Sequence, residues 1–122
     1  DTLPYNAHTT CSDALWVGLP VLTCLGSTFA GRVAASLLQA VDLPQMVTRS
    51  FDEYEALALK LAREPATLAA IKAKLRANRD TVALFDTARF TRNLEAAYAK
   101  MWERSQRGLA PATFLADGAS LS

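Results

Sequence analysis

The sequence is poor in the residues that build metal centres and disulfide frameworks. Its 122 residues include one histidine and two cysteines, Cys11 and Cys24, which do not form a C-x-x-C pair. These are too few ligands for a structural zinc site, and the pattern requires no disulfide. We interpret both cysteines as reduced small residues of a cytoplasmic protein. An Asp-x-Asp motif, which often marks a metal site, is also missing.

The sequence also lacks a strong excess of charge and any long apolar run. Its formal net charge is +1, from 13 basic and 12 acidic residues, which gives no reason to expect nucleic-acid binding. No segment is apolar for long enough to span a bilayer. With 51% hydrophobic and 20% charged residues, the composition predicts a folded, soluble chain of at most one domain.

The most informative stretch lies near the start of the chain. It runs His8-Thr9-Thr10-Cys11-Ser12-Asp13-Ala14-Leu15-Trp16 and closes with Gly18-Leu19-Pro20. The pattern predicts a turn that enters a short helix, with residues 14–16 as its buried face. Gly18 suits the left-handed position after the last turn, and Pro20 prevents the helix from continuing. Residues 21–25, apolar and β-branched at their start, predict a buried strand.

The entrance of this helix has the chemistry that a nucleotide requires. The first turn of a helix has backbone N–H groups without partners and a partial positive charge, so it attracts an anion such as a diphosphate. Thr9 and Thr10 add two hydroxyl donors there, and His8 lies just outside. Asp13, three residues after Thr10, can accept hydrogen bonds from the two hydroxyls of a ribose. Together these four residues predict a nucleotide site.

A purely structural interpretation of the same spacing stays open at this stage. In a capping box, Thr10 would accept a hydrogen bond from the third amide of the helix, and Asp13 would reach back to the amide of the capping residue. Spacing alone does not separate this interpretation from a ligand site.

Strands and helices alternate in the next part of the chain. Residues 26–28 predict a turn with Thr28 as a candidate cap. A helix over residues 29–40 follows, with its apolar positions at helical spacing; these positions are Phe29, Val33, Leu37 and Ala40. Residues 43–47 predict a turn and a short strand. Parallel strands need such crossovers and bind ligands at their carboxyl ends, so Gly26-Ser27-Thr28 is a second candidate for the binding pocket.

Three further helices are predicted after the second strand. The S-x-x-E pattern at Ser50 fits a capping box and opens a helix to about residue 63. Pro65 suits the first turn of the next helix, whose basic residues we interpret as its solvated face. Asp86 or Thr87 can cap the last helix, which ends near Gly108. This last helix carries a broad apolar stripe that needs a partner surface; its members are Phe90, Leu94, Tyr98, Met101 and Trp102.

The motif His8-Thr9-Thr10-x-x-Asp13-Ala14-Leu15-Trp16-x-Gly18-x-Pro20, continued by Arg32-Val33-Ala34-Ala35-Ser36, resembles the C-terminal catalytic lobe of protein O-GlcNAc transferases, including the SPINDLY-like proteins. The resemblance covers residues 1 to about 107. It implies an α/β fold class: the C-terminal part of a Rossmann-like GT-B lobe, with short parallel strands and helices, followed by a helical C-terminal section. Residues 1–108 would then be a fragment of the donor-binding lobe, and residues 109–122 a disordered tail.

The resemblance also implies a function. UDP-GlcNAc would be the donor, with its diphosphate at Thr9 and Thr10, its ribose on Asp13, and His8 near the phosphates or the sugar. GlcNAc would pass to a Ser or Thr hydroxyl of a protein acceptor with inversion, without a metal or other cofactor. The missing N-terminal lobe and tetratricopeptide repeats would be partners in the same polypeptide, with no nucleic acid or membrane involved. No catalytic base is identified, so the isolated fragment is expected to be inactive.

Two alternatives remain open. The lobe could serve another GT-B enzyme with a different nucleotide sugar or acceptor, or it could be a binding or scaffolding module without turnover. The nucleotide sugar that the longest available protein prefers distinguishes an O-GlcNAc transferase from another GT-B enzyme. Binding of UDP without transfer would favour a module without turnover.

Overall fold

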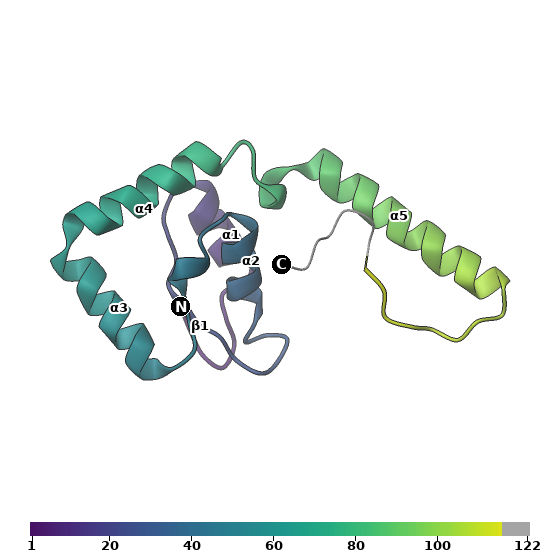
Figure 1. Cartoon of the computed structure of the whole chain (residues 1–122), viewed down its shortest axis with the longest axis horizontal. Helices are drawn as coiled ribbons and strands as arrows, with labels where there is room; N and C mark the ends of the chain where they lie inside the picture. The colour runs from purple at the N-terminus through teal and green to yellow at the C-terminus, as the bar shows by residue number, and fades with distance from the viewer. Residues whose placement is uncertain (116–122) are drawn as a thin grey trace. The chain divides into compact units, whose positions relative to one another are not determined.

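The computed structural model, which describes residues 1–115, places a strand–helix–strand unit among further helices (Figure 1). The elements in chain order are α1 (Thr9–Trp16), β1 (Thr23–Cys24), α2 (Val33–Ala40), the 3₁₀ turn η1 (Pro44–Met46), β2 (Val47–Thr48), α3 (Phe51–Arg63), α4 (Pro65–Asn78), the 3₁₀ turn η2 (Ala83–Phe85) and α5 (Thr87–Gln106).

The strands β1 and β2 form a parallel pair joined through α2. Thr23 lies opposite Val47, and Cys24 opposite Thr48. The Thr48 hydroxyl donates to the carbonyl of Thr23 at 2.9 Å, and the amide of Leu25 donates to the carbonyl of Thr48 at 2.8 Å. The predicted alternation of strand, helix and parallel strand is therefore confirmed. The first strand is shorter than the predicted residues 21–25, because only two of its residues pair with β2.

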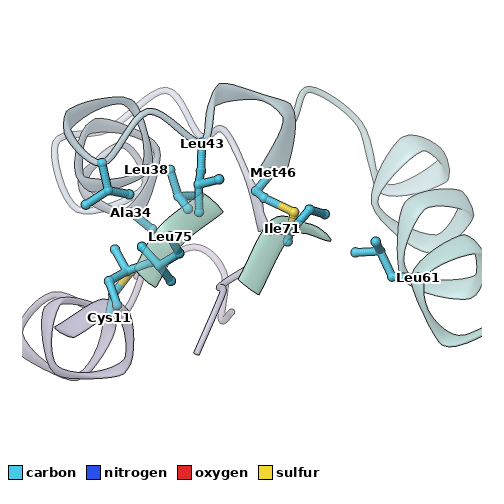
Figure 2. Close-up of a cluster of buried hydrophobic side chains, with 10 residues drawn as sticks. Cys11, Ala34, Leu38, Leu43, Met46, Leu61, Ile71 and Leu75 are labelled. Atoms are coloured by element: carbon cyan, nitrogen blue, oxygen red, sulfur yellow. The ribbon is translucent and has the colours of Figure 1, made fainter. Parts of the chain in front are cut away.

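The core lies between the helices and gathers apolar side chains from α1, α2, η1, α3 and α4 (Figure 2). Its members are Cys11, Leu15, Ala34, Leu38, Val41, Leu43, Met46, Leu61, Ile71 and Leu75. Four of the leucines are completely buried, and each such side chain contributes about 1.5–3 kcal/mol relative to an exposed one. This core fixes the position of α1, whose first turn is the predicted site.

The buried side of α1 differs from the prediction. Cys11 and Leu15 are buried, because residues four apart lie on the same face of a helix, whereas Trp16 is 49% exposed. Trp16 lies at the margin of the core, edge-on to Phe85, with the Arg79 guanidinium 5.0 Å from its ring centroid. The expected end of the helix is confirmed: Gly18 has φ +83°, and its amide donates back into the last turn.

The helix predicted over residues 29–40 was too long, since α2 begins only at Val33. Residues 26–31 instead form a closed loop, in which the amide of Gly26 donates to the carbonyl of Gly31 at 2.7 Å. The Thr28 hydroxyl accepts from the amide of Gly31, so it caps this loop and not the helix. Phe29 is consequently 82% exposed, and the buried side of α2 is formed by Ala34, Ala35 and Leu38.

The helices α3 and α4 follow the prediction closely. Ser50 caps α3 by accepting from the amide of Glu53 at 3.2 Å, and the Glu53 carboxylate accepts from the amide of Arg49 at 2.7 Å. Pro65 is the first residue of α4, where its missing N–H costs nothing. On the basic face of α4, Lys74 forms an ion pair of 2.9 Å with Asp42.

The chain divides into two compact units, one of residues Asp1–Phe85 and one that begins at Asp86. In the second unit, Asp86 caps α5 by accepting from the amide of Arg89, and Gly108 takes φ +64° just after the helix end. The predicted start and end of this helix are thus confirmed. All five residues of its apolar stripe are exposed, from 37% at Leu94 to 66% at Trp102.

Residues 109–115 form no helix or strand, although Arg104 donates to the carbonyl of Ala110 at 2.7 Å. The lobe boundary at residue 108 and the disorder of residues 109–122 stay predictions, and residues 116–122 lie outside the described part of the chain. Within residues 1–115, none of the helices combines the length and the apolar character needed to traverse a membrane.

Candidate functional site

The first turn of α1 is open toward solvent. The helix has its first backbone hydrogen bond from the amide of Ser12 to the carbonyl of His8, at 3.1 Å. Within residues 1–115, no group accepts from the amides of Thr9, Thr10 and Cys11. Thr9 and Thr10 are exposed, and their first turn contains no acidic residue. Free amides, two hydroxyls and a positive helix end form an arrangement that favours an anion.

The structural alternative, a capping box of Thr10 and Asp13, is wrong. The helix begins at Thr9 with His8 in the capping position, so Thr10 is already the second helical residue. No side chain caps this helix end. Asp13 is exposed, and its carboxylate accepts no hydrogen bond from the described residues. It therefore remains available to a ligand on the same helix as the two threonines.

His8 lies in a small aromatic cluster at this entrance. Its ring stacks on Tyr5, with centroids 4.7 Å apart, and meets the edge of Phe29 at 6.2 Å. The Nε2 atom of His8 is buried and has no hydrogen-bond partner. The same holds for Oδ1 of Asn6, two residues earlier. A buried polar atom without a partner costs roughly 1–3 kcal/mol, so two of them distinguish this helix end from the other helix ends in the described part of the chain.

A hollow of about 320 Å³ lies at the carboxyl ends of both strands. Gly26, Ser27 and Thr28 line it after β1, and Arg49 and Ser50 line it after β2. This is where open parallel sheets bind ligands. The second candidate pocket, which the sequence placed at residues 26–28, therefore coincides with a real hollow. Phe29, the next residue along the chain, meets the ring of His8 with its edge.

Cys11, the third residue of α1, does not offer reactive chemistry. Its side chain belongs to the core and is 1% exposed. Burial raises the pKa of the Cys11 thiol above its ordinary value, because the thiolate would lose its solvation. The residue is thus a protonated packing group beneath the open turn, with its thiol facing the core.

The sequence alone did not single out Tyr5, Phe29 or Arg49 as neighbours of this site. Tyr5 is also close to His8 in the sequence, whereas Phe29 is near it only in space. The loop 26–31 folds back on the segment before α1, where the amide of Asn6 donates to the carbonyl of Ala30 at 3.0 Å. One signal could have indicated it: Gly26 and Gly31 pack so closely that a Cβ on Gly31 would lie 3.2 Å from the Cα of Gly26. A close approach of this kind explains two glycines five residues apart.

The parallel strand pair, its crossover helix α2 and the helix α1 beside it define part of a Rossmann-like α/β lobe. The model of glycosyltransferase family 41 matches residues 1–94. The chain belongs to this family, as the motif from His8 to Pro20 predicted.

Similar proteins include several glycosyltransferases. The chain is 44% identical over 115 residues to the probable UDP-N-acetylglucosamine–peptide N-acetylglucosaminyltransferase SEC of Arabidopsis thaliana, covering 93% of this chain and 12% of that protein. It is 35% identical over 109 residues to the UDP-N-acetylglucosamine–peptide N-acetylglucosaminyltransferase of Caenorhabditis elegans, covering 89% and 10%. The chain thus spans about one eighth or less of these relatives.

Among solved structures, the chain is similar to the K341M mutant of the Thermobaculum terrenum O-GlcNAc transferase. The TM-score is 0.81 at 39% sequence identity, over 90% of this chain and 21% of that one. The predicted fold class, part of a Rossmann-like GT-B lobe, is therefore confirmed. Within residues 1–115, no three His, Cys, Asp or Glu side chains group closely enough to hold a metal ion.

Proposed function

We propose that this chain is the C-terminal part of the donor-binding lobe of a protein O-GlcNAc transferase. The donor is UDP-GlcNAc, and the acceptor is a Ser or Thr hydroxyl of a protein. The observation that carries the proposal is the open first turn of α1, where three amides have no partner among the described residues. The choice of UDP-GlcNAc as the nucleotide sugar is supported by the related proteins that carry UDP-N-acetylglucosamine in their names.

The diphosphate lies against the amides at the start of α1 and accepts hydrogen bonds from the hydroxyls of Thr9 and Thr10. When the bond between the sugar and UDP breaks, negative charge develops on the leaving phosphate. Donors fixed in place before the reaction stabilise that charge without reorganising, and one such donor contributes about 2.7–4 kcal/mol in well-studied enzymes. This arrangement supports departure of UDP without a metal ion, which is part of the proposal.

Asp13 and His8 have different roles. Asp13 accepts hydrogen bonds from the ribose hydroxyls, and its place in the second turn of α1 keeps its charge away from the diphosphate. His8 precedes the helix, and its unpartnered Nε2 donates a hydrogen bond to an oxygen of the phosphate or the sugar. The hollow at residues 26–28 offers space beside them for part of the donor.

Other groups of the enzyme come from the rest of the polypeptide. No residue of this chain is assigned as the base that activates the acceptor hydroxyl. We propose that an N-terminal lobe and tetratricopeptide repeats belong to the same polypeptide, that the enzyme is cytoplasmic, and that this segment alone does not catalyse transfer. The exposed stripe of α5 is the surface that the other lobe covers.

The test is a titration of UDP, UDP-GlcNAc and UDP-glucose into the full-length protein by calorimetry, together with a transfer assay. Tightest binding of UDP-GlcNAc, with transfer to a protein, supports the proposal. Tighter binding of another nucleotide sugar would indicate a different glycosyltransferase. Binding of UDP without hydrolysis or transfer would indicate a module that has kept the lobe but not the activity.

A further inference from the structure

A larger hollow, of about 680 Å³, lies along α2 and is distinct from the one at the strand ends. Its floor is apolar and includes Leu25, Val33 and Val47. Arg32 and Arg49 line the same groove, one from the start of α2 and one from the end of β2, and both are exposed. We name this feature the α2 groove.

The charge of the α2 groove is of one sign. No acidic residue lines it. Two basic residues of α4 and its end have acidic neighbours, since Lys74 pairs with Asp42 and Arg79 with Asp80. Within residues 1–115, Arg32 and Arg49 form no such pair. The Glu53 carboxylate accepts from the amide of Arg49 and forms no ion pair with its guanidinium group. Two guanidinium groups without a paired carboxylate, beside apolar side chains, match a ligand that carries both carboxylates and apolar groups.

The α2 groove adjoins the proposed donor site. Phe29 lines the groove, and the edge of its ring meets the ring of His8 at 6.2 Å. Leu25 and Arg49 line both the groove and the hollow at the strand ends. An extended peptide advances about 3.3 Å per residue, so a chain with its hydroxyl at the donor reaches the groove within a few residues.

We propose that the α2 groove binds an acidic segment of the protein acceptor, next to the Ser or Thr that receives the sugar. Arg32 and Arg49 pair with carboxylates of that segment, and the apolar floor takes its neighbouring side chains. This inference rests on the proposed function and names the acceptor class for the same site. It assigns acceptor selection to two arginines, of which Arg49 also lines the hollow at the strand ends and Arg32 does not.

The experiment compares three peptides in the full-length protein: an acceptor with Glu and Leu beside its Ser, the same peptide with Gln in place of Glu, and one with Lys. The wild-type protein should have the lowest KM for the Glu peptide. The double variant Arg32→Glu/Arg49→Glu should raise that KM by about tenfold, as expected when two partly exposed attractions become repulsions. It should lower the KM for the Lys peptide. The single variant Arg32→Glu, whose arginine does not line the hollow at the strand ends, should leave the KM for UDP-GlcNAc within twofold.

The matched control is Arg63→Glu, which reverses the charge of another exposed arginine, at the end of α3 and outside the groove. It should leave all three peptide KM values within twofold. An unchanged preference for the Glu peptide in the double variant would overturn the proposal. The proposal would also be overturned if the three peptides had equal KM values and inorganic phosphate inhibited their glycosylation equally. That result would indicate a simple anion site.

Binding of the fluorescently labelled Glu peptide, measured by anisotropy without donor, separates this inference from the proposed function. Weaker peptide binding in the double variant supports the groove even if UDP-GlcNAc is not the donor. Normal UDP-GlcNAc binding together with peptide binding that ignores both arginines would reject the groove and leave the donor site intact.

Discussion

Two helices begin near the proposed site, α1 and α3, and their N-termini differ in whether a side chain caps the first turn. The start of α3 is closed by its own side chains, since Ser50 accepts from the amide of Glu53, and its first turn contains two acidic residues. The start of α1 has no side-chain cap and no acid in its first turn. Both helices have the same backbone requirement, because the first amides of any helix lack partners within it.

The difference shows where the protein forgoes stability. A side-chain cap contributes about 0.5–2 kcal/mol, and α3 has one while α1 does not. The uncapped end coincides with the buried unpartnered atoms of Asn6 and His8. The helices α2 and α4 also begin without a side-chain cap, so the missing cap alone does not distinguish α1. The start of α1 differs from theirs by the two exposed threonines and by the unpartnered atoms beside it, which support the proposed anion site.

The largest effect is expected when α1 is made to resemble α3. Thr9→Glu places an acid in the first turn, where it interacts favourably with the helix end but occupies the place of the diphosphate. A like charge at about 4 Å costs up to about 4 kcal/mol at the effective dielectric near a protein surface. Calorimetry with UDP should show affinity reduced by this order, while hydrogen exchange of the α1 amides should become slower or stay the same.

Thr9→Gln is the matched neutral control and should lose far less affinity than Thr9→Glu, since it removes a hydroxyl without adding charge. Equal losses in the two variants would mean that electrostatics at the helix end do not determine binding. The comparison of α1 with α3 would then have no functional meaning.

The second effect concerns Asp13, which has no partner among the described residues. Asp13→Ala should reduce UDP affinity by about 1.5–3 kcal/mol, as for hydrogen bonds to a charged group, and should leave folding largely intact because the side chain is exposed. The loss of affinity is measured by calorimetry with UDP and with 2′-deoxy-UDP. The variant should no longer distinguish the two ligands; an unfolded Asp13→Ala protein would show that the carboxylate is structural.

The capped helices were predictable from the sequence because their signals are local. Ser50 and Glu53, Pro65, and Asp86 each satisfy amides or fill positions within one turn of themselves, so residue type and spacing suffice. The pair Thr10 and Asp13 has the same spacing as a cap, and the sequence could not separate a cap from a ligand site. Only the position of the helix start, one residue before Thr10, decides between them.

The errors in the prediction arose where distant segments meet. Phe29 has the spacing of a helical core residue, but the closed loop 26–31 keeps it out of α2. Trp16 is apolar and follows Leu15, yet it is half exposed, because Cys11 and Leu15 occupy the face of α1 that packs on the core. In each case tertiary contacts overrode a local apolar pattern.

A smaller effect is expected at the closed helix end. Ser50→Ala removes the cap of α3 and should lower the stability of that helix by about 1 kcal/mol, measured as faster hydrogen exchange of the amides of residues 51–53. Because the diphosphate is proposed at α1 and not at α3, UDP affinity should fall far less than in Asp13→Ala, although Ser50 lines the hollow at the strand ends. Ser50→Asp, which restores an acceptor, is the control and should recover the protection; a loss of UDP affinity in Ser50→Ala as large as that in Asp13→Ala would contradict the division between the two helix ends.

The smallest effect concerns Cys11, which lies on the core-facing side of the first turn of α1. The pKa of its thiol is raised in the folded protein by burial, so the folded state favours the neutral thiol. The stability linked to this group is fully present below the ordinary thiol pKa and is lost as the pH rises through the raised value. Denaturant unfolding should therefore show a decline in alkaline solution that is weaker in Cys11→Ala, after correction for the lower stability of that variant at neutral pH. Thiol reagents should modify Cys11 slowly at neutral pH. Rapid modification without unfolding would show that solvent also reaches the core-facing side of the first turn of α1.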